Sequence, residues 1–192
     1  MKVLIACEFS GIVRDAFRAL GHDAWSLDVM PCERDPTYHI QMRLREGDAA
    51  TEDILSRGWD LLGTHPHCTH LALSGSKHFW RKRKEQAEAV AFCKYLMSAP
   101  VPRIYLENPK SVLSTQMRKF DQVIQPWQFG HGEVKETWLW LKGLPKLVPT
   151  NIVSGRTARV HKTAPGITRK RERSRTFPGI AAAMAQQWGG QA

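Results

Sequence analysis

The sequence predicts an α/β protein with a mainly parallel sheet covered by helices on both faces. Two observations support this prediction. Short apolar runs that suit buried strands recur along the chain, and helical windows separate them. The first unit runs strand, glycine turn, helix and strand, and an aspartate closes its second strand. At 192 residues the chain is long enough for one domain with a substantial core.

The first βαβ unit is predicted in the N-terminal part of the chain. The apolar run 3–6 indicates a buried strand, and residues 8–11 form the turn that follows it. A helical pattern follows this turn and ends at Gly21. A second strand over 24–29 carries Asp28 near its end. The predicted apolar face of the helix consists of Ile12, Ala16, Phe17, Ala19 and Leu20.

Later elements repeat this alternation. Further strands are predicted over 59–64, 103–106 and 137–141, and a short helix after Gly47-Asp48. The most helical window is 85–97, and an Ala-rich helix is expected over 177–188. The core positions proposed for the 85–97 window are Ala87, Val90, Ala91, Tyr95 and Leu96.

Polar residues follow several of these strands. In parallel sheets the carboxyl ends of the strands meet at one edge, where ligands bind. This rule brings together Phe9 to Gly11, Asp28, His65 to His70 and Glu107 to Pro109.

The composition is that of an ordinary globular protein. Hydrophobic residues make up 42% and charged residues 24%, which excludes a mostly disordered or collagen-like chain. No apolar run approaches the ~18 residues of a membrane span, and Glu8 interrupts the N-terminal run before a signal-peptide core could form. The four cysteines show no paired short spacing, so free thiols are expected. We therefore expect a soluble, cytoplasmic protein without a membrane partner.

Almost all of the excess positive charge lies in one segment, residues 142–175. This segment holds ten Lys and Arg against one acid, Glu172, and the rest of the chain is nearly balanced. A basic patch of this kind fits a polyanion, most commonly nucleic acid. A solvated loop would have the same composition.

Cys68 is a candidate nucleophile. It follows a predicted strand, is flanked by His65, His67 and His70, and precedes the basic-aromatic loop 77–84. Neighbouring positive charge lowers the pKa of a thiol and raises its thiolate fraction. Two other interpretations stay open, namely a buried apolar filler and a metal site of a metal-dependent hydrolase. The spacing matches no standard zinc pattern, so no metal is expected.

Glu107 ends another predicted strand, and Pro109 fixes the turn after it. A carboxyl at this place could act as a general acid or recognise the edge of a base, and otherwise it is a strand-end turn residue. Loop 77–84 mixes aromatic and cationic residues, as a stacking groove for nucleic acid does. Phe79 and Trp80 packed inward would give the same pattern.

The order of these motifs resembles the series of the DNA cytosine-C5 methyltransferases, and more closely that of their short, phage-type members. The series is a Phe-x-Gly turn, an acid ending the second strand, a Gly-Asp, a cysteine loop and a Glu-Asn after the next strand. Trp127-Gln128-Phe129-Gly130 and Arg175-Thr176-Phe177-Pro178 extend the resemblance over nearly the whole chain. It implies a Rossmann-like class I methyltransferase fold over 1–192, with 142–175 as a basic insert in place of a full target-recognition domain.

The resemblance also implies a reaction, partners and residue roles. S-Adenosylmethionine would be the cofactor, and duplex or single-stranded DNA would be the substrate. A partner protein would be a further source of target recognition. The protein would act in the cytoplasm of a bacterial host cell. Cys68 would add to C6 of a flipped cytosine, and Glu107 would hydrogen-bond N3. The implied cofactor-binding residues are Phe9, Ser10, Gly11, Asp28, which would hold the ribose, Asp48, which would meet adenine, and Pro66. The implied substrate-binding residues are Asn108, Lys77, Arg81, Arg83, Arg173 and Arg175.

Some positions depart from the family pattern. His67 stands where the family has a proline before the cysteine, and Val13 and Arg14 replace two glycines. The family's arginine-containing stretch is not reproduced, and Lys135 is the nearest cation. The interval 144–173 is too short for an independent recognition domain. Two alternatives follow. One is a degenerate methyltransferase fold that binds nucleic acid without turnover, and the other is a cytosine-modifying enzyme that acts on RNA, single strands or nucleotides.

Overall fold

A seven-stranded, mainly parallel sheet organises the part of the chain that the computed structural model describes, residues 1–159 and 169–190. The strands are β1 (Lys2–Ala6), β2 (Asp23–Asp28), β3 (His39–Gln41), β4 (Leu61–Thr64), β5 (Arg103–Asn108), β6 (Gln122–Ile124) and β7 (Thr137–Lys142). Their order across the sheet is β3-β2-β1-β4-β5-β7-β6. Strands β1 to β5 are parallel, and β7 runs antiparallel to β5 and to β6.

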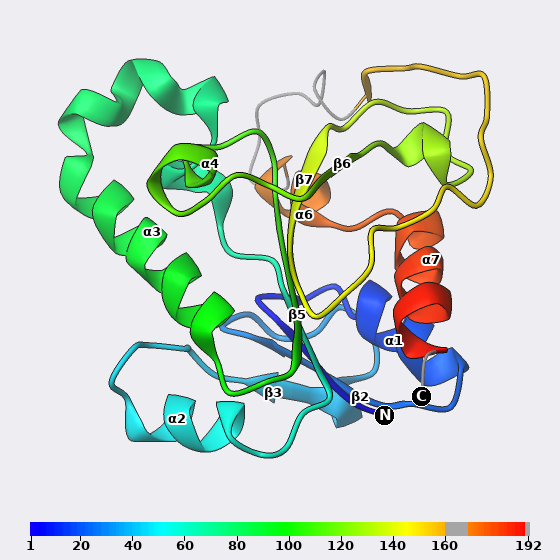
Figure 1. Ribbon diagram of the computed structural model, residues 1–192, viewed down its shortest axis with the longest axis horizontal. Helices are drawn as coiled ribbons and strands as arrows, with labels where there is room; N and C mark the ends of the chain where they lie inside the picture. The colour runs from blue at the N-terminus through cyan, green and yellow to red at the C-terminus, as the bar shows by residue number, and fades with distance from the viewer. Residues whose placement is uncertain (160–168, 191–192) are drawn as a thin grey trace.

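Helices cover both faces of this sheet (Figure 1). The α-helices are α1 (Ile12–Ala19), α2 (Ala49–Leu55), α3 (Arg83–Ser98), α4 (Leu113–Gln116), α6 (Arg169–Ser174) and α7 (Pro178–Gly189). The 3-10 helices are η1 (Pro36–Tyr38), η2 (Cys68–His70), η3 (Leu73–Arg81) and η4 (Pro126–Gln128). Helices α1 and α7 pack side by side on one face, and α2 and α3 cover the other (Figure 1). None of the described helices is long and apolar enough to cross a membrane.

Alternate side chains of β1 enter two different hydrophobic clusters. Val3 and Ile5 lie in the cluster that includes α1 and α7, and Leu4 and Ala6 lie in the cluster that includes α2 and α3. Since both faces of the central strands are covered, all four positions are apolar. This explains why the sequence shows a continuous apolar run here rather than an alternation of polar and apolar residues.

The predicted fold class is confirmed. The five predicted strands correspond to β1, β2, β4, β5 and β7, and the predicted helices correspond to α1, α2, α3 and α7. Strands β3 and β6 were not predicted, because each has only three residues and no sustained pattern.

Two predicted helix faces are wrong in detail. Helix α1 ends at Ala19, so Leu20 is 49% exposed, and Val13 and Arg14 are buried together with Phe17. In α3 the buried residues are Val90, Cys93 and Leu96, while Ala87 and Ala91 are exposed. Small residues fit both exposed and buried positions, so they define a helix face poorly.

Arg14, one of the residues that departs from the family pattern, is fully buried. Its Nε donates to Asp15 Oδ1 at 2.8 Å, and its Nη1 donates to Ser26 Oγ at 3.1 Å and to the Asp35 carbonyl at 2.9 Å. These bonds satisfy part of the buried guanidinium, whereas Nη2 makes no hydrogen bond within the described residues and is paired by charge with Asp15 Oδ1 at 2.7 Å. Arg14 therefore ties α1 to β2 and to the loop that follows β2.

Gly63 in β4 leaves room for the side chain of Tyr105 in β5. The two residues are partners in the parallel register, and Tyr105 is fully buried. A Cβ atom at position 63 would lie 2.5 Å from the phenol ring, far inside van der Waals contact. The small residue is thus required by the packing of Tyr105.

Gly63→Ala is expected to lower the free energy of unfolding by about 1–3 kcal/mol, because neither central strand can move away from the added methyl group. Urea denaturation measures this loss. Gly75→Ala is the matched control, since its methyl group would meet only Phe79 at 3.9 Å. Equal stabilities of Gly63→Ala and the wild type would contradict the close packing.

Candidate active site

The carboxyl ends of β1, β2, β4 and β5 meet at one edge of the sheet. Thr64 and Leu106 are partners in the register of β4 and β5. The residues that follow them, His65 and Glu107, therefore come side by side. Asp28 ends β2, which β1 separates from β4, at the same edge.

His65 links two side chains of β5. Its Nε2 lies 2.9 Å from Tyr105 Oη, and its Nδ1 lies 2.9 Å from Glu107 Oε2. Burial raises the pKa of Glu107, but the charge and hydrogen bond of His65, helped by Lys135 and Thr176, outweigh it and hold the pKa below its ordinary value. Glu107 is therefore a carboxylate at neutral pH. The register of the strands was the signal that could have paired His65 with Glu107 from the sequence.

Cys68 begins η2 and is exposed. The protein atoms around its thiol raise its pKa, the charges of Arg173 and Lys135 oppose this rise, and Glu107 adds to it. The net direction is up, so the expectation of a lowered thiol pKa is wrong. The Asn108 side-chain amide donates to the Pro66 carbonyl at 3.0 Å, which fixes the loop that carries Cys68 against β5.

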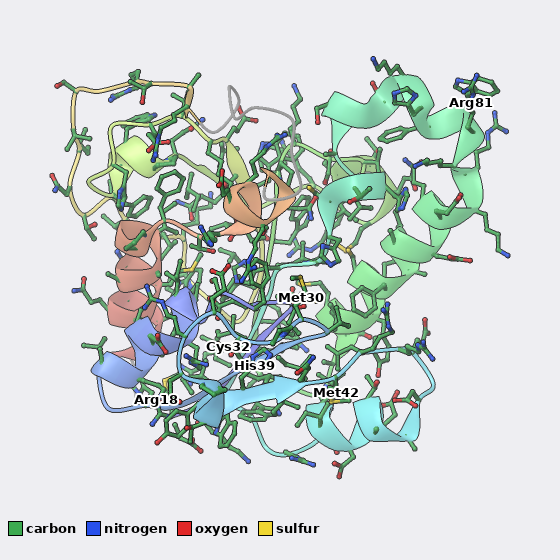
Figure 2. All side chains as sticks on the ribbon, turned by 180° about the vertical axis from the view of Figure 1, so that it is seen from behind. Arg18, Met30, Cys32, His39, Met42 and Arg81 are labelled. Carbon is green, nitrogen blue, oxygen red and sulfur yellow. The ribbon has the colours of Figure 1, made fainter. Side chains whose placement is uncertain are left out.

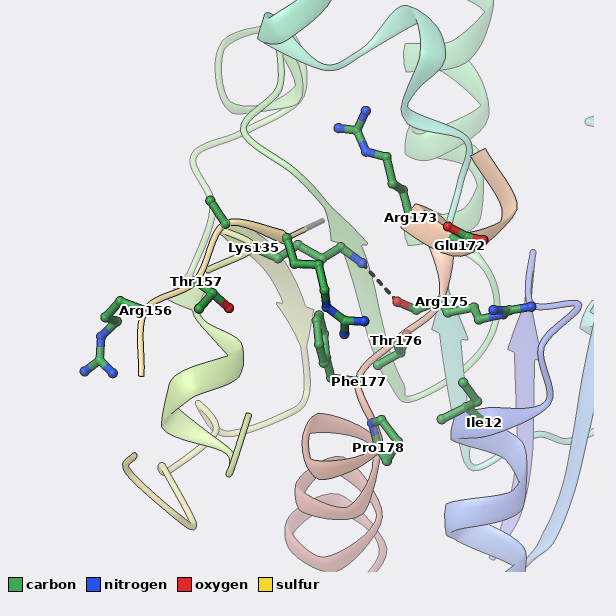
Figure 3. A pocket seen from close by; sticks show the side chains of 12 residues that line it. Ile12, Lys135, Arg156, Thr157, Glu172, Arg173, Arg175, Thr176, Phe177 and Pro178 are labelled. Carbon is green, nitrogen blue, oxygen red and sulfur yellow. Dashed lines mark hydrogen bonds between the residues drawn. The ribbon is translucent and has the colours of Figure 1, made fainter. Parts of the chain in front are cut away.

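Several residues of the basic segment line a cavity of about 1120 Å³, which we call the basic cavity (Figure 3). Its cationic lining residues are Lys135, Arg156, Arg159, Arg173 and Arg175, and its acid is Glu172. Lys135 Nζ donates to the Arg175 carbonyl at 3.0 Å (Figure 3). Lys135 and Arg173 are also the cations that act on the Cys68 thiol. The basic cavity and Cys68 are therefore neighbours.

A second cavity of about 540 Å³, the Asp28 cavity, lies between the segment after β2 and helix α3. Its walls are mainly apolar, and the buried Asp28 and Pro66 are among its lining residues. Asp28 Oδ1 accepts the Met30 amide at 2.9 Å. Size, apolar walls and a buried carboxylate are typical of a small-molecule site.

The other predicted cofactor residues do not line the Asp28 cavity. Phe9 is buried, and the Arg171 guanidinium lies 5.7 Å from the centre of its ring. Ser10 is buried and its hydroxyl donates to Glu8 at 3.1 Å. Gly11 is the residue just before α1, and its positive φ of 69° suits glycine. Asp48 caps α2 by accepting the amide of Thr51 at 3.0 Å.

The amino end of α1 is occupied by Glu8, a residue without a role in the sequence-based prediction. Its buried carboxylate accepts the amides of Val13 at 2.7 Å and Arg14 at 3.3 Å. Dinucleotide cofactors place their phosphates on the helix amino end that follows the first strand. Burial raises the pKa of this carboxyl group. Because it already occupies the two amides, they are not available to a phosphate, so this turn suits a cofactor without a phosphate group there.

Apart from Asn108, the predicted substrate residues are cations and fall into two groups. Arg173 and Arg175 line the basic cavity. Lys77, Arg81 and Arg83 lie exposed on η3 and at the start of α3, and Figure 2 shows Arg81 at the outer end of this region, far from Cys32 and His39. They line neither described cavity.

The loop aromatics point in different directions. Phe79 packs against the hydrophobic cluster of α3, β5 and β7, whereas Trp80 is 65% exposed. The Arg81 guanidinium lies over the Trp80 ring at 4.5 Å from its centre. The interpretation that both aromatics pack inward is therefore wrong for Trp80.

The three histidines around Cys68 do not converge. His65 contacts Tyr105 and Glu107, while His67 and His70 line the Asp28 cavity. Within residues 1–159 and 169–190, no three His, Cys, Asp or Glu side chains are grouped so that they could hold a metal ion.

Glu33 holds the basic segment against the N-terminal half of the sheet. Arg175 donates to both of its oxygens, Nε to Oε2 at 2.8 Å and Nη2 to Oε1 at 2.7 Å, and Arg171 pairs with the same carboxylate. Hydrogen bonds from Arg175, followed by those from Arg171, lower the pKa of Glu33. No local sequence pattern could indicate this pairing, because each arginine lies more than a hundred residues from Glu33 in the chain.

The sheet order, the helices on both faces and the cavity at the carboxyl edge define a Rossmann-like α/β protein. No protein-family model and no curated protein sequence matches this chain. Among solved structures, it is similar to a protein from Escherichia coli described as a DNA modification methyltransferase encoded within a prophage, with 12% identity and a TM-score of 0.49. The match covers 87% of this chain and 56% of that protein.

Glu33→Gln is expected to lower the free energy of unfolding at pH 7 by about 1–2 kcal/mol, because the half-exposed arginines lose a charged acceptor. The pKa of Glu33 is lowered in the folded state, so its contribution is present above the ordinary glutamate pKa and is lost as the pH falls through the folded value. The difference in stability between variant and wild type should therefore vanish in acid.

Denaturant titration between pH 7 and pH 2 measures this difference. Asp53→Asn is the control, since it removes an exposed ion pair between Asp53 in α2 and Arg57 just after this helix. It should lower the free energy of unfolding by less than about 0.5 kcal/mol. A difference for Glu33→Gln that is the same at every pH would refute the ion-pair explanation.

Proposed function

We propose that the protein is an S-adenosylmethionine-dependent methyltransferase that modifies C5 of cytosine in DNA, with Cys68 as its nucleophile. One observation carries the proposal. The exposed Cys68 lies in the loop between the Asp28 cavity and the basic cavity. The Asp28 cavity has a buried carboxylate and the size of a nucleoside site, and the basic cavity is lined by cations. The Glu107 carboxylate is close enough to Cys68 to act on its thiol.

The Asp28 cavity fits the cofactor. Asp28 stands at the end of the second strand, where Rossmann-like proteins carry the acid that accepts ribose hydroxyls. Phe92 and the other apolar lining residues suit a base, and Glu8 at α1 excludes phosphate. When bound, S-adenosylmethionine supplies a methyl group on a positively charged sulfur.

The basic cavity supports a nucleic acid substrate. Its arginines and Lys135 suit phosphate groups, which fix position without reading sequence. Chemistry on C5 and C6 requires the base to leave its stack, and Cys68 is exposed for contact with such a base.

Cys68 performs covalent catalysis in this proposal. The thiol loses its proton to solvent, with Arg173 and Lys135 stabilising the thiolate. A bond forms between Sγ and C6 while the electron pair of the C5–C6 double bond becomes available at C5. After the methyl group is in place, the C5 proton leaves to solvent, the pair returns to the double bond, and the S–C6 bond breaks to restore the thiolate. Meanwhile the Glu107 carboxylate accepts a hydrogen bond from the N4 amino group, and from N3 once the adduct has taken up a proton there from solvent.

A cytosine-modifying enzyme for single strands is the second candidate, favoured by the exposed Trp80 under Arg81. Exposed aromatics among cations are stacking platforms for unpaired bases. Turnover on a single-stranded oligonucleotide that exceeds turnover on the duplex and on the mononucleotide would favour this candidate.

Cys68→Ala is expected to abolish product without loss of the fold, because residue 68 is exposed and lies outside the hydrophobic clusters. Nucleoside mass spectrometry of DNA from expressing cells should find new 5-methylcytosine for the wild type and none for the variant. Thr69→Ala, an exposed neighbour in the same turn, is the matched control and should retain product. Product from Cys68→Ala would disprove the mechanism, and no product from the wild type would disprove methylation of cytosine.

The affinity for duplex DNA is expected to fall with salt, with a slope of about −0.9 in log K against log salt for each phosphate contact. Arg173→Gln should reduce that slope by about one unit and weaken different sequences equally, because a phosphate contact carries no sequence information. Fluorescence anisotropy over a salt series measures both effects. Arg57→Gln, just after α2 and not among the residues that line the basic cavity, serves as control. A slope that does not respond to Arg173→Gln would place the DNA elsewhere.

A further inference from the structure

Cys32 lies in the loop that follows β2, and the protein holds its sulfur atom with two donors (Figure 2). The side chain is half-buried, and its Sγ accepts from Arg14 Nη1 and from the Arg34 amide, each at 3.4 Å. The Glu33 amide donates to the Phe9 carbonyl at 2.9 Å, so this loop is fixed against the turn before α1. The sulfur of Cys32 therefore has a defined position, although a small molecule can reach it.

Arg14 places a buried donor beside this sulfur. Its side chain is fully buried, and its Nη2 makes no hydrogen bond within the described residues. Asp15 Oδ1 lies 2.7 Å from Nη2 and balances the charge of the guanidinium. A guanidinium cannot lose its charge in a protein, and a buried N–H without an acceptor is unfavourable. Nη2 is thus suited to bind a small acceptor that comes to Cys32.

Gly11 brings Nη2 and the sulfur to the same small space. A Cβ atom at position 11 would lie 2.7 Å from Arg14 Nη2 and 3.4 Å from Cys32 Sγ. The first distance is too short for a methyl group, but it is the length of a hydrogen bond from a charged nitrogen to an oxygen. The second lies in the range of about 3–3.5 Å at which two reacting atoms stand before a bond forms. An oxygen atom in this space would meet a donor and a nucleophile together.

We propose that this space binds a hydroperoxide and that Cys32 is the thiol that the hydroperoxide oxidises. Arg14 Nη2 donates to the peroxide. The Cys32 thiol gives its proton to solvent, and the thiolate attacks the terminal peroxide oxygen. The S–O bond forms as the O–O bond breaks, and the hydroxide or alkoxide that leaves takes a proton from solvent. The sulfur loses two electrons, the peroxide gains them, and Cys32 becomes a sulfenic acid.

This site is separate from the proposed methyltransferase chemistry. Gly11, Arg14 and Cys32 line neither the basic cavity nor the Asp28 cavity. Exposure alone favours oxidation of Cys68, which is exposed, over Cys32, which is half-buried. A sulfur that is merely half-buried would also react more slowly in the folded chain than in the unfolded chain. The proposal predicts the opposite in both comparisons.

Oxidation of the full chain by hydrogen peroxide tests the site, with dimedone to trap sulfenic acids and mass spectrometry after trypsin digestion. Each of the four cysteines lies on a separate tryptic peptide, so their rates are measured in one sample. Cys32 should be labelled about tenfold faster than Cys68 in the folded protein, and about tenfold faster than Cys32 itself in urea-unfolded protein. Cys32→Ser should lose this label, and Cys68→Ala should keep it.

Arg14→Lys tests the role of the guanidinium. An ammonium group keeps the charge but lacks the planar fork that contacts the sulfur and the peroxide together, so labelling of Cys32 should slow about tenfold. Arg34→Lys is the matched control, because its half-exposed side chain pairs with Asp15 and only its backbone amide contacts Cys32. It should be labelled like the wild type. Far-UV circular dichroism checks that both variants are folded.

A rate for Cys32 in the folded wild type that is no higher than in the unfolded chain would overturn the site. That comparison needs no variant, so it decides the proposal even where Arg14→Lys fails to fold. A folded Arg14→Lys variant that is oxidised at the wild-type rate would overturn the binding of peroxide by Arg14. These measurements use neither S-adenosylmethionine nor DNA, so their outcome is independent of the proposed function.

Discussion

The close approach of β4 and β5 at Gly63 is the constraint on which the candidate site depends. Because Gly63 has no side chain, the ring of Tyr105 lies across it, and the two strands keep a register that brings His65 beside Glu107. One packing requirement deep in the sheet thus helps to place a histidine beside a carboxylate at the edge. The packing of the core therefore also positions residues of the proposed active site.

The loop after β4 separates two different environments. His67 and His70 line the Asp28 cavity, while Cys68 in the same turn is subject to the charges of the basic cavity. Asn108 holds the loop to β5 through the Pro66 carbonyl. In the proposed reaction, the base attacked by Cys68 would lie between these two environments, with its C5 atom towards the methyl donor, which is the arrangement that transfer between two bound molecules requires.

Much of the fold and part of the site could be predicted from the sequence. Buried parallel strands give continuous apolar runs, and the strand-end rule correctly predicted that Asp28 and Glu107 lie at one edge of the sheet, with the Cys68 loop following β4 there. Interactions between distant residues could not be found in this way. Glu33 binds arginines of the basic segment, and burial reverses the expected pKa shift of Cys68, because both effects depend on atoms that only the tertiary structure brings together.

The pairing of Glu33 with Arg171 and Arg175 means that an acid from the N-terminal part of the chain neutralises some of the charge of the basic segment. Arg159, in the same cavity, pairs with Glu133 in a similar manner. The positive field in front of the cavity is therefore weaker than the count of lysines and arginines suggests. A polyanion that reaches these arginines exchanges one set of carboxylates for phosphates, so its association is a competition between anions rather than the filling of bare positive charge.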